Sequence, residues 1–177
     1  MQSDIVKGGS EVMNAYKLYL AERWLYVHHI PLFPKLIKGL IYFFHNSSIP
    51  YEAKLGKNCK FLYGGIGCVI SKKTTMGDHV VIGTNVLTGG RSNKEGHPRI
   101  GSNVYISTGA KVLGDITIAD NVIIGANAVV IHDVPSNCSV GGVPAKILKE
   151  NIDVTEYCSL KYYGKEIPAE KSGGESQ

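Results

Sequence analysis

The sequence predicts an all-β solenoid that follows a short N-terminal helical segment. The first observation is a six-residue repeat between residues 75 and 134, in which the second and sixth places hold apolar or small residues. A period of six fits neither the helical repeat nor the alternation of a flat strand. It fits a coil with three short sides that stacks on the next coil about 4.8 Å away. The predicted inward residues of the second place are Met76, Ile82, Ile100, Ile106, Val112, Ile118, Ile124 and Val130.

The corners of the coil provide the second observation. Gly often follows the second place and Asn often holds the fifth, as in Gly83 with Asn85 and Gly101 with Asn103. Gly adopts, and Asn tolerates, the unusual backbone angles of a tight corner. The alternative is a β-sandwich, whose turns would recur irregularly at about 8–12 residues. The constant short period favours the solenoid.

Two interruptions of the period are the third observation. The first is the Gly-rich insertion Tyr63–Gly67, and the second runs from Leu87 to Pro98. The second stretch is polar and turn-rich, which predicts a loop projecting from one corner. Insertions in solenoids tend to lie on the binding face, so both interruptions are candidates for the functional site.

The residues before the repeat are predicted to form two helices. Residues 10–27 place apolar side chains at helical spacing, and a second helix begins near Pro34, a residue tolerated in a first turn. One interpretation is that both helices cap the solenoid or pack against a neighbouring subunit. The other is peripheral membrane contact through residues 30–44, with Lys35 and Lys38 facing lipid phosphates. The predicted apolar stripes are Met13, Tyr16, Leu20, Trp24 and Val27, then Leu36, Ile37, Leu40, Ile41 and Phe44.

These patterns divide the chain into three parts. Residues 1–48 form the helical segment, 49–146 the solenoid, and 147–177 a short helix at 150–163 with a polar, disordered tail. At 177 residues with a net charge of +4, the chain fits an anionic small ligand as well as a nucleic acid, and no long basic run favours the nucleic acid. The apolar stretch at 30–44 is too short and too broken by Pro and Lys to span a bilayer.

The cysteines point to a reducing compartment. Their spacing suggests neither a disulfide nor a metal site, so we expect a cytoplasmic protein without a bound metal. The four residues are Cys59, Cys68, Cys138 and Cys158.

One of the six histidines stands apart. His97 lies in the long loop beside Pro98 and Arg99, whereas the others lie near helix ends or at corners, where surface or packing roles are expected. An imidazole there can accept a proton from an attacking hydroxyl at neutral pH. The chain has no Ser-His-Asp order, metal-ligand spacing or phosphate-binding Gly-rich fingerprint, so spacing alone does not define a reaction.

The sequence resembles the hexapeptide-repeat acyltransferases over residues 49–149. The resemblance rests on the sixes, Gly89-Gly90, His97–Gly101, Gly109–Gly114 and Gly141–Lys146. Within this family, the sequence is similar to the branch that contains the serine acetyltransferases and their relatives in surface-polysaccharide gene clusters. This resemblance implies a left-handed parallel β-helix, a homotrimer, and acetyl-CoA lying between adjacent subunits. It also implies direct transfer, in which a histidine deprotonates the acceptor hydroxyl that attacks the thioester.

The resemblance also implies roles for individual residues. His97 would be the general base with Tyr63 as a helper, and Gly89 and Gly90 would lie near the thioester. Residues assigned to the pantetheine channel are Thr108, Ala126 and Ile131. Lys146 and Lys149 would meet the phosphates of the nucleotide end, the alternative being a solvated face.

The chain departs from serine acetyltransferases at their expected catalytic pair and at the residue that orients it. Those enzymes have an Asp-His pair where this sequence has Tyr63-Gly64, and a second Asp where it has Ser48. This difference leads us to expect an O-acetyltransferase that acts on a sugar or glycan hydroxyl. The alternatives are serine O-acetylation for cysteine synthesis and a catalytically silent binding subunit.

Overall fold

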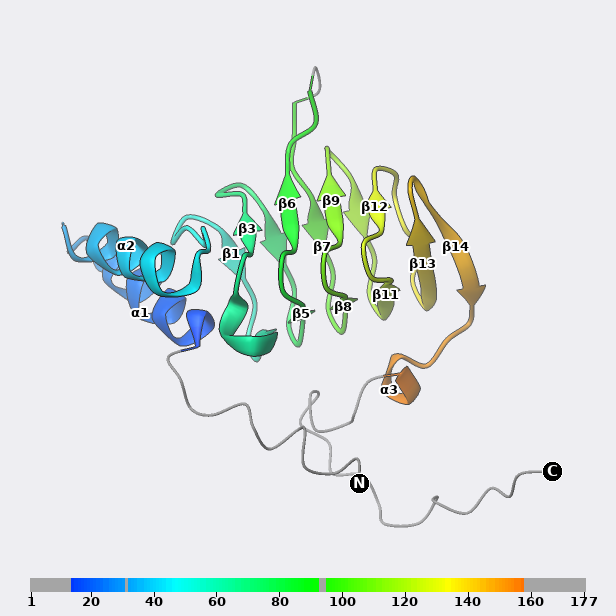
Figure 1. The fold of residues 1–177 in the computed structure, drawn as a ribbon, viewed down its shortest axis with the longest axis horizontal. Helices are drawn as coiled ribbons and strands as arrows, with labels where there is room; N and C mark the ends of the chain where they lie inside the picture. Colours follow the sequence, from blue (N-terminus) through cyan, green and yellow to red (C-terminus); the bar gives the residue numbers. More distant parts are fainter. Residues whose placement is uncertain (1–13, 31, 93–94, 158–177) are drawn as a thin grey trace, which may run out of the picture.

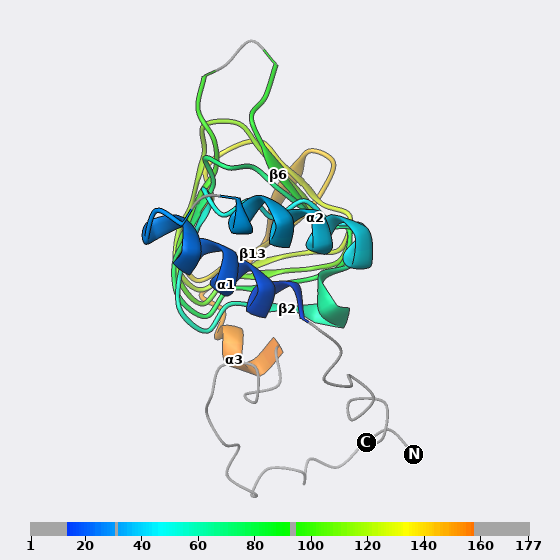
Figure 2. The ribbon, with the colours of Figure 1, turned by 90° about the vertical axis from the view of Figure 1, so that its left-hand side faces the viewer.

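The computed structural model describes residues 14–30, 32–92 and 95–157. Helices α1 (Ala15–Val27) and α2 (Phe33–His45) lie side by side across one end of a stack of short strands (Figures 1 and 2). The stack ends in a wide hairpin and a last short helix, α3 (Val154–Tyr157). The strands are β1 (Lys54–Leu55), β2 (Lys60–Phe61), β3 (Val69–Ile70), β4 (Thr75–Met76), β5 (Val81–Ile82), β6 (Leu87–Gly89), β7 (Arg99–Ile100), β8 (Tyr105–Ile106), β9 (Lys111–Leu113), β10 (Thr117–Ile118), β11 (Val122–Ile124), β12 (Val129–Val130), β13 (Cys138–Gly142) and β14 (Ala145–Glu150).

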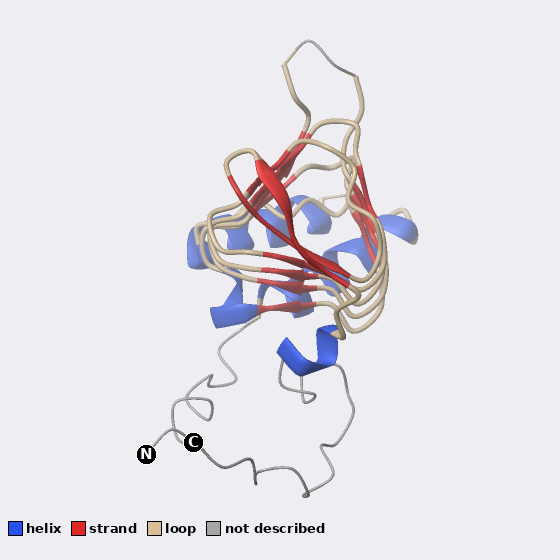
Figure 3. Cartoon of the chain, turned by 90° about the vertical axis from the view of Figure 1, so that its right-hand side faces the viewer, coloured by secondary structure: helices blue, strands red, loops and turns tan. Residues whose placement is uncertain are grey.

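The strands form three sheets that the chain visits in turn. Their orders are β1-β4-β7-β10, β14-β13-β11-β8-β5-β2 and β12-β9-β6-β3, so every third strand returns to the same sheet through β12. All pairs are parallel except β13 with β14. Viewed along the stack, the sheets make three sides around a common interior (Figure 3). The predicted three-sided solenoid is therefore observed.

The register shows where the two insertions fall. Arg99 pairs with Thr117 one regular coil later, whereas Thr75 pairs with Arg99 across the coil that carries the long loop. The first insertion forms η1 (Leu62–Gly65) between β2 and β3, with left-handed backbone angles at Tyr63 and Gly64. Neither insertion disturbs the stacking of the strands that flank it.

The core is the column of inward residues that the repeat predicted. All eight second-place residues are buried, from Met76 at one end to Val130 at the other. Thr88 takes the same inward position in β6, where it pairs with Val112 and Ile70. The expectation that the second interruption begins at Leu87 was wrong: β6 continues through Gly89, and the loop begins at Gly90.

The corner residues serve two different purposes. Asn85 and Asn103 have positive φ angles of 55°, as predicted. Gly83 does not; instead, a Cβ added to it would lie 2.5 Å from the backbone nitrogen of Thr108 in the next coil. At this corner glycine is required by the close approach of adjacent coils rather than by its own backbone angle.

Helix α1 is present, but its predicted apolar stripe was wrong. Asn14 caps the helix by accepting a hydrogen bond from the N–H of Tyr16. The buried side is Ala15, Tyr19 and Glu22, because the Tyr19 hydroxyl donates to the carbonyl of Ala53 in the first coil. The stripe residues Leu20, Trp24 and Val27 are exposed instead, and Met13 lies outside the described residues.

Helix α2 begins at Phe33 with Pro34 in its first turn, as predicted. Of its expected apolar side, Ile41 is buried and joins the core, whereas Leu36, Leu40 and Phe44 are exposed. The helices thus cap the solenoid with one side and leave much of their apolar surface uncovered.

The C-terminal part of the described chain forms a strand before its short helix. β14 pairs antiparallel with β13 and runs across residue 146, where the solenoid was expected to end. Helix α3 covers only part of the helix expected at 150–163. Residues 158–177, including Cys158 and the predicted tail, lie outside the described residues. Cys59, Cys68 and Cys138 are buried and unbridged. In the described ranges no helix has the length and apolar character needed to cross a bilayer.

Candidate functional site

The long loop projects from the edge where the β3-β6-β9-β12 sheet meets the β1-β4-β7-β10 sheet (Figure 1). It leaves β6 at Gly90 and returns to β7 at Arg99. By register, Ser71, Gly89, Leu113 and Ile131 follow one another along this edge, which we call the loop edge.

His97 is held at the loop edge by a hydrogen bond. Its Nδ1 lies 2.8 Å from the hydroxyl oxygen of Ser71, and its side chain is half-buried. Ser71 is itself fixed, because its backbone N–H donates to the carbonyl of Thr88 at 3.0 Å. The buried Thr88 hydroxyl pairs with the Thr74 hydroxyl at 2.9 Å. The imidazole is thus tied to the frame of the coils, although it belongs to a loop.

The other ring nitrogen of His97 faces a residue without a side chain. A Cβ added to Gly90 would lie 3.5 Å from Cε1 and 3.7 Å from Nε2 of His97. The space beside Nε2 is therefore free of a Gly90 side chain.

This arrangement suits an imidazole that accepts a proton. When Nδ1–H donates to Ser71 Oγ, Nε2 carries the lone pair and is the nitrogen that can act as a base. The same hydrogen bond persists after Nε2 has taken a proton, because both nitrogens then donate.

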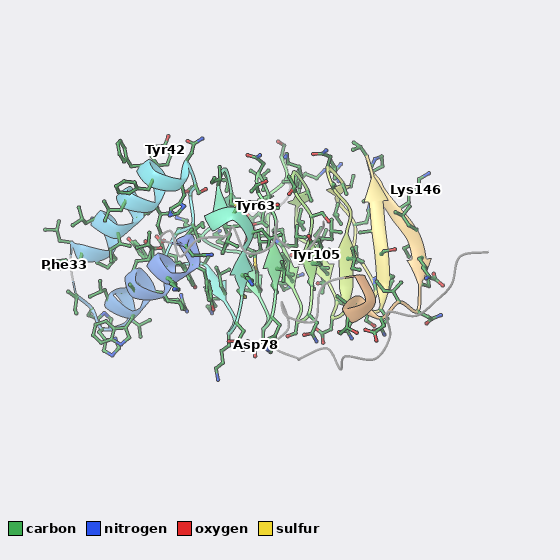
Figure 4. The ribbon with its side chains drawn as sticks, turned by 60° about the horizontal axis from the view of Figure 1, so that its bottom comes forward. Phe33, Tyr42, Tyr63, Asp78, Tyr105 and Lys146 are labelled. Atoms are coloured by element: carbon green, nitrogen blue, oxygen red, sulfur yellow. The ribbon has the colours of Figure 1, made fainter. Side chains whose placement is uncertain are left out.

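Tyr63 is not part of this cluster within one chain. Tyr63 lies in η1, just before the amino end of β3, and 77% of its surface is exposed. His97 lies beyond the carboxyl end of β6, the parallel neighbour of β3 in the same sheet. Tyr63 therefore lies near the opposite edge of that sheet (Figures 1 and 4). Any joint action of Tyr63 and His97 requires two copies of the chain.

The residues predicted to contact acetyl-CoA fall into three groups. Gly89 and Ile131 share the loop edge with His97. Thr108 and Ala126 are exposed on the opposite edge, where Thr108 accepts a hydrogen bond from the Asn127 N–H. Lys146 and Lys149 are exposed on β14, at the end of the solenoid remote from α1 and α2 (Figure 4).

Two shallow depressions, each with a volume of about 280 Å³, mark the surface elsewhere. One lies beside the connection between α1 and α2 and the other over β7 and β10, and neither is lined by His97. Near the site, Arg99 and Asp115 form an exposed ion pair at 2.6 Å. Across the described ranges, no three His, Cys, Asp or Glu side chains are grouped as a metal site would require.

Sequence reasoning missed Ser71, which nothing in the repeat distinguishes from other corner residues. A partial signal was Thr88, a polar residue at an inward place. The structure shows why it is tolerated: its hydroxyl is satisfied by Thr74, and its strand holds Ser71 against the loop.

Comparison with known proteins gives two kinds of match. Residues 97–132 match the family model described as bacterial transferase hexapeptide (six repeats). Two curated relatives are serine acetyltransferases. The protein from Synechococcus elongatus is 37% identical over 150 residues, covering 80% of this chain and 61% of its own length. The protein from Synechocystis sp. is 41% identical over 138 residues, covering 77% of this chain and 55% of its own length. This chain thus spans only about three fifths of the relatives it matches.

A solved structure extends the match to the fold. Serine acetyltransferase from Brucella abortus in complex with coenzyme A is similar with a TM-score of 0.72 and 31% identity, over 77% of this chain and 55% of that one. The three sheets, whose strands pair in parallel except for β14, and the N-terminal helices are consistent with the left-handed β-helix expected from the resemblance. The names of these relatives do not point to the polysaccharide branch that the sequence suggested.

Proposed function

We propose that this chain is a left-handed β-helix acyltransferase of the hexapeptide-repeat family, which transfers an acetyl group from acetyl-CoA to the hydroxyl of a small acceptor. The observation that carries the proposal is the His97 imidazole, which is hydrogen-bonded to Ser71 through Nδ1 and lies beside Gly90, a residue without a side chain. It occurs on a fold similar to that of a structure with coenzyme A bound.

The proposed chemistry is a direct transfer. His97 Nε2 takes the proton of the acceptor hydroxyl while the hydroxyl oxygen bonds to the thioester carbonyl carbon. The C–S bond then breaks, and the coenzyme A thiolate leaves and recovers the proton from the imidazolium. Ser71 Oγ accepts a hydrogen bond from Nδ1–H throughout, and it stabilises the imidazolium that exists between proton uptake from the acceptor and proton return to the thiolate.

We propose a homotrimer, because one chain does not assemble the predicted contacts. Side-by-side copies would place the loop edge of one against the opposite edge of the next, bringing His97 and Ile131 toward a neighbour's Thr108 and Ala126. Tyr63 of the neighbour would also approach His97. The coil of β13 lies three coils beyond that of β6, roughly 14 Å along the stack. Lys146 and Lys149 would then meet the phosphates of an extended acetyl-CoA.

L-Serine is the first candidate acceptor, since the relatives are named serine acetyltransferases. A sugar or glycan hydroxyl is the second candidate. The specific observation favouring it is the Tyr63-Gly64 sequence, with left-handed backbone at both residues, where the resemblance expects Asp-His. The proposed compartment is the cytoplasm, supported by the buried, unbridged cysteines.

The decisive assay follows release of the coenzyme A thiol with L-serine and, separately, with a panel of nucleotide sugars. Saturation by L-serine would establish the first acceptor, and turnover only with a sugar the second. His97→Ala should reduce turnover at least a hundredfold. His79→Asn is a matched control, because His79 occupies a corner with φ of 58°, the position that asparagines hold elsewhere.

A thermal shift with acetyl-CoA separates an enzyme or binding subunit from a protein that does not bind the donor. A ligand that binds only the folded state raises the melting temperature. A shift without turnover on any acceptor would support the silent binding subunit. Unchanged turnover in His97→Ala would overturn the assignment of the base.

A further inference from the structure

The outward sides of α1 and α2 form an apolar surface that the proposed reaction does not use. The inner sides of the helices are packed on the first coil through Tyr19 and Ile41. The outer sides look away from the coils (Figures 1 and 2). We call the outer surface the end-cap face. Its large apolar members are Leu20, Trp24, Val27, Phe33, Leu36, Leu40, Phe43 and Phe44, all of which are exposed.

The contribution of α2 is a continuous stripe. Phe33, Leu36, Leu40 and Phe43 are spaced by three or four positions, which places them on one side of the helix. Phe44 lies between that side and the buried Ile41. Phe43 is 81% exposed. Exposing so large an aromatic side chain to water is unfavourable unless another surface covers it. Phe33 lies at the outer end of α2, and Tyr42 extends from the same helix (Figure 4).

Among the residues that the structure describes, the end-cap face carries positive and no negative charge. Lys17 and Lys35 are exposed beside the apolar residues. Between residues 14 and 50 the only acidic residue is Glu22, which is completely buried. Burial raises the pKa of its carboxyl to about 8, which favours the neutral form. Arg23 points inward, where it donates to the carbonyls of Tyr51 and Ala53.

We propose that the end-cap face docks on the surface of an anionic lipid bilayer. Exposed lysines beside an apolar stripe match the anionic headgroups and the acyl boundary of such a surface. Trp24 and Tyr42 suit the headgroup level, where amphipathic rings are favoured. A second copy pairing through this face would bring lysines near lysines without a carboxylate to offset them, so charge complementarity favours lipid.

The geometry also leaves the rest of the molecule accessible. The end-cap face looks along the axis of the solenoid, whereas the loop edge with His97 runs along its side (Figures 1 and 2). A chain resting on a bilayer through α1 and α2 therefore keeps the loop in water. Within the proposed homotrimer, copies with parallel axes would present three such faces to one plane and bind by multivalent contact.

Trp24 makes the test direct, because it is the only tryptophan in the sequence and lies on the end-cap face. The full chain is mixed with vesicles of phosphatidylcholine containing a third phosphatidylglycerol, or with phosphatidylcholine vesicles alone. We expect co-sedimentation and a blue shift of Trp24 fluorescence with the anionic vesicles, both weakened by salt. The double variant Leu36→Glu/Phe43→Glu should lower vesicle affinity at least tenfold, and Lys35→Glu should lower it by less.

Leu148→Glu is the matched control, since Leu148 is a similarly exposed apolar residue at the far end of the solenoid, on β14. It should bind vesicles like the unmodified chain. Absence of lipid-dependent change in the unmodified chain would overturn the proposal. So would a Trp24 shift that depends on protein concentration without lipid and accompanies a doubling of particle size, which would identify a second copy as the occupant. Resistance of Trp24 to acrylamide quenching without lipid would show that the chain itself covers the face, and would also overturn it.

Discussion

The hydroxyl oxygen of Ser71 lies 2.8 Å from Nδ1 of His97 and joins a loop residue to the end of β3. Because Ser71 fixes the ring, Ser71→Ala should leave the imidazole less well aimed and free to carry its proton on Nε2 instead of Nδ1. We expect kcat to fall roughly three- to tenfold, the value of one hydrogen bond. The KM for acetyl-CoA and the melting temperature should change little.

Ser71→Thr supplies the control for this prediction, since it retains the hydroxyl and should recover most of the lost rate. Equal kcat values for the alanine variant and the unmodified chain would show that Ser71 does not position His97.

Gly90→Ala tests the role of the narrow space between residue 90 and the imidazole. The added methyl would lie 3.5 Å from His97 Cε1, which is ordinary contact, so the chain should fold with an unchanged melting temperature. The methyl would nevertheless occupy the approach to Nε2, and we expect kcat/KM for the acceptor to fall at least tenfold. Steady-state kinetics with the acceptor identified by thiol release measure this. Full activity would place the reacting atoms elsewhere.

Most of the fold could be predicted from the sequence because the solenoid is built from local, repeated rules. One inward apolar residue per side and one tight corner per six residues recur with so little variation that Ile82, Ile106 and Ile124 take equivalent places in successive coils. The helices obey no such repeat. The buried side of α1 was predicted wrongly because polar contacts of Tyr19 and Arg23 with the first coil decide its rotation, and these partners are more than 25 residues away.

The candidate site was predictable only in part for the same reason. His97 stood out because it lies in an insertion, whereas Gly90 was named only through the resemblance to the acyltransferases. Ser71 could not be found, since its contact with His97 depends on how the loop folds back over the preceding coil. The positions of Thr108 and Ala126 on a different edge from His97 follow from the three-sided coil, which sequence spacing alone does not convert into distances.

The buried carboxyl of Glu22 should make stability depend on pH. Burial raises its pKa from an unfolded value of 4.5 to about 8, with attraction by Lys38 opposing the effect and repulsion by Glu52 adding to it. Between these pH values the folded state holds a proton that the unfolded state has lost. Stability is therefore fully present below pH 4.5 and decreases as pH rises to about 8, by up to about 1.4 kcal/mol per pH unit.

Glu22→Gln should remove this dependence, because the amide stays neutral at every pH. Urea unfolding at pH 5 and pH 8 measures the effect. We expect the variant and the unmodified chain to be similar at pH 5, and the variant to be the more stable at pH 8. The same loss of stability with pH in both proteins would assign the effect to another group.

Two glycines provide the sharpest test of how the coils are packed. A Cβ at Gly83 would lie 2.5 Å from the nitrogen and 2.8 Å from the Cα of Thr108, and both are backbone atoms of the adjacent coil that cannot turn aside. Gly83→Ala should therefore destabilise the chain by about 2 kcal/mol or more. Gly39 lies inside α2, where an added Cβ meets nothing within 4 Å. Gly39→Ala should stabilise the chain by about 0.5–1 kcal/mol, because alanine restricts the unfolded chain and favours helix. Thermal or urea unfolding of the two variants in parallel should give stability changes of opposite sign. A destabilisation of similar size in both variants would mean that the close approach of the coils at Gly83 is not the cause of the stability loss.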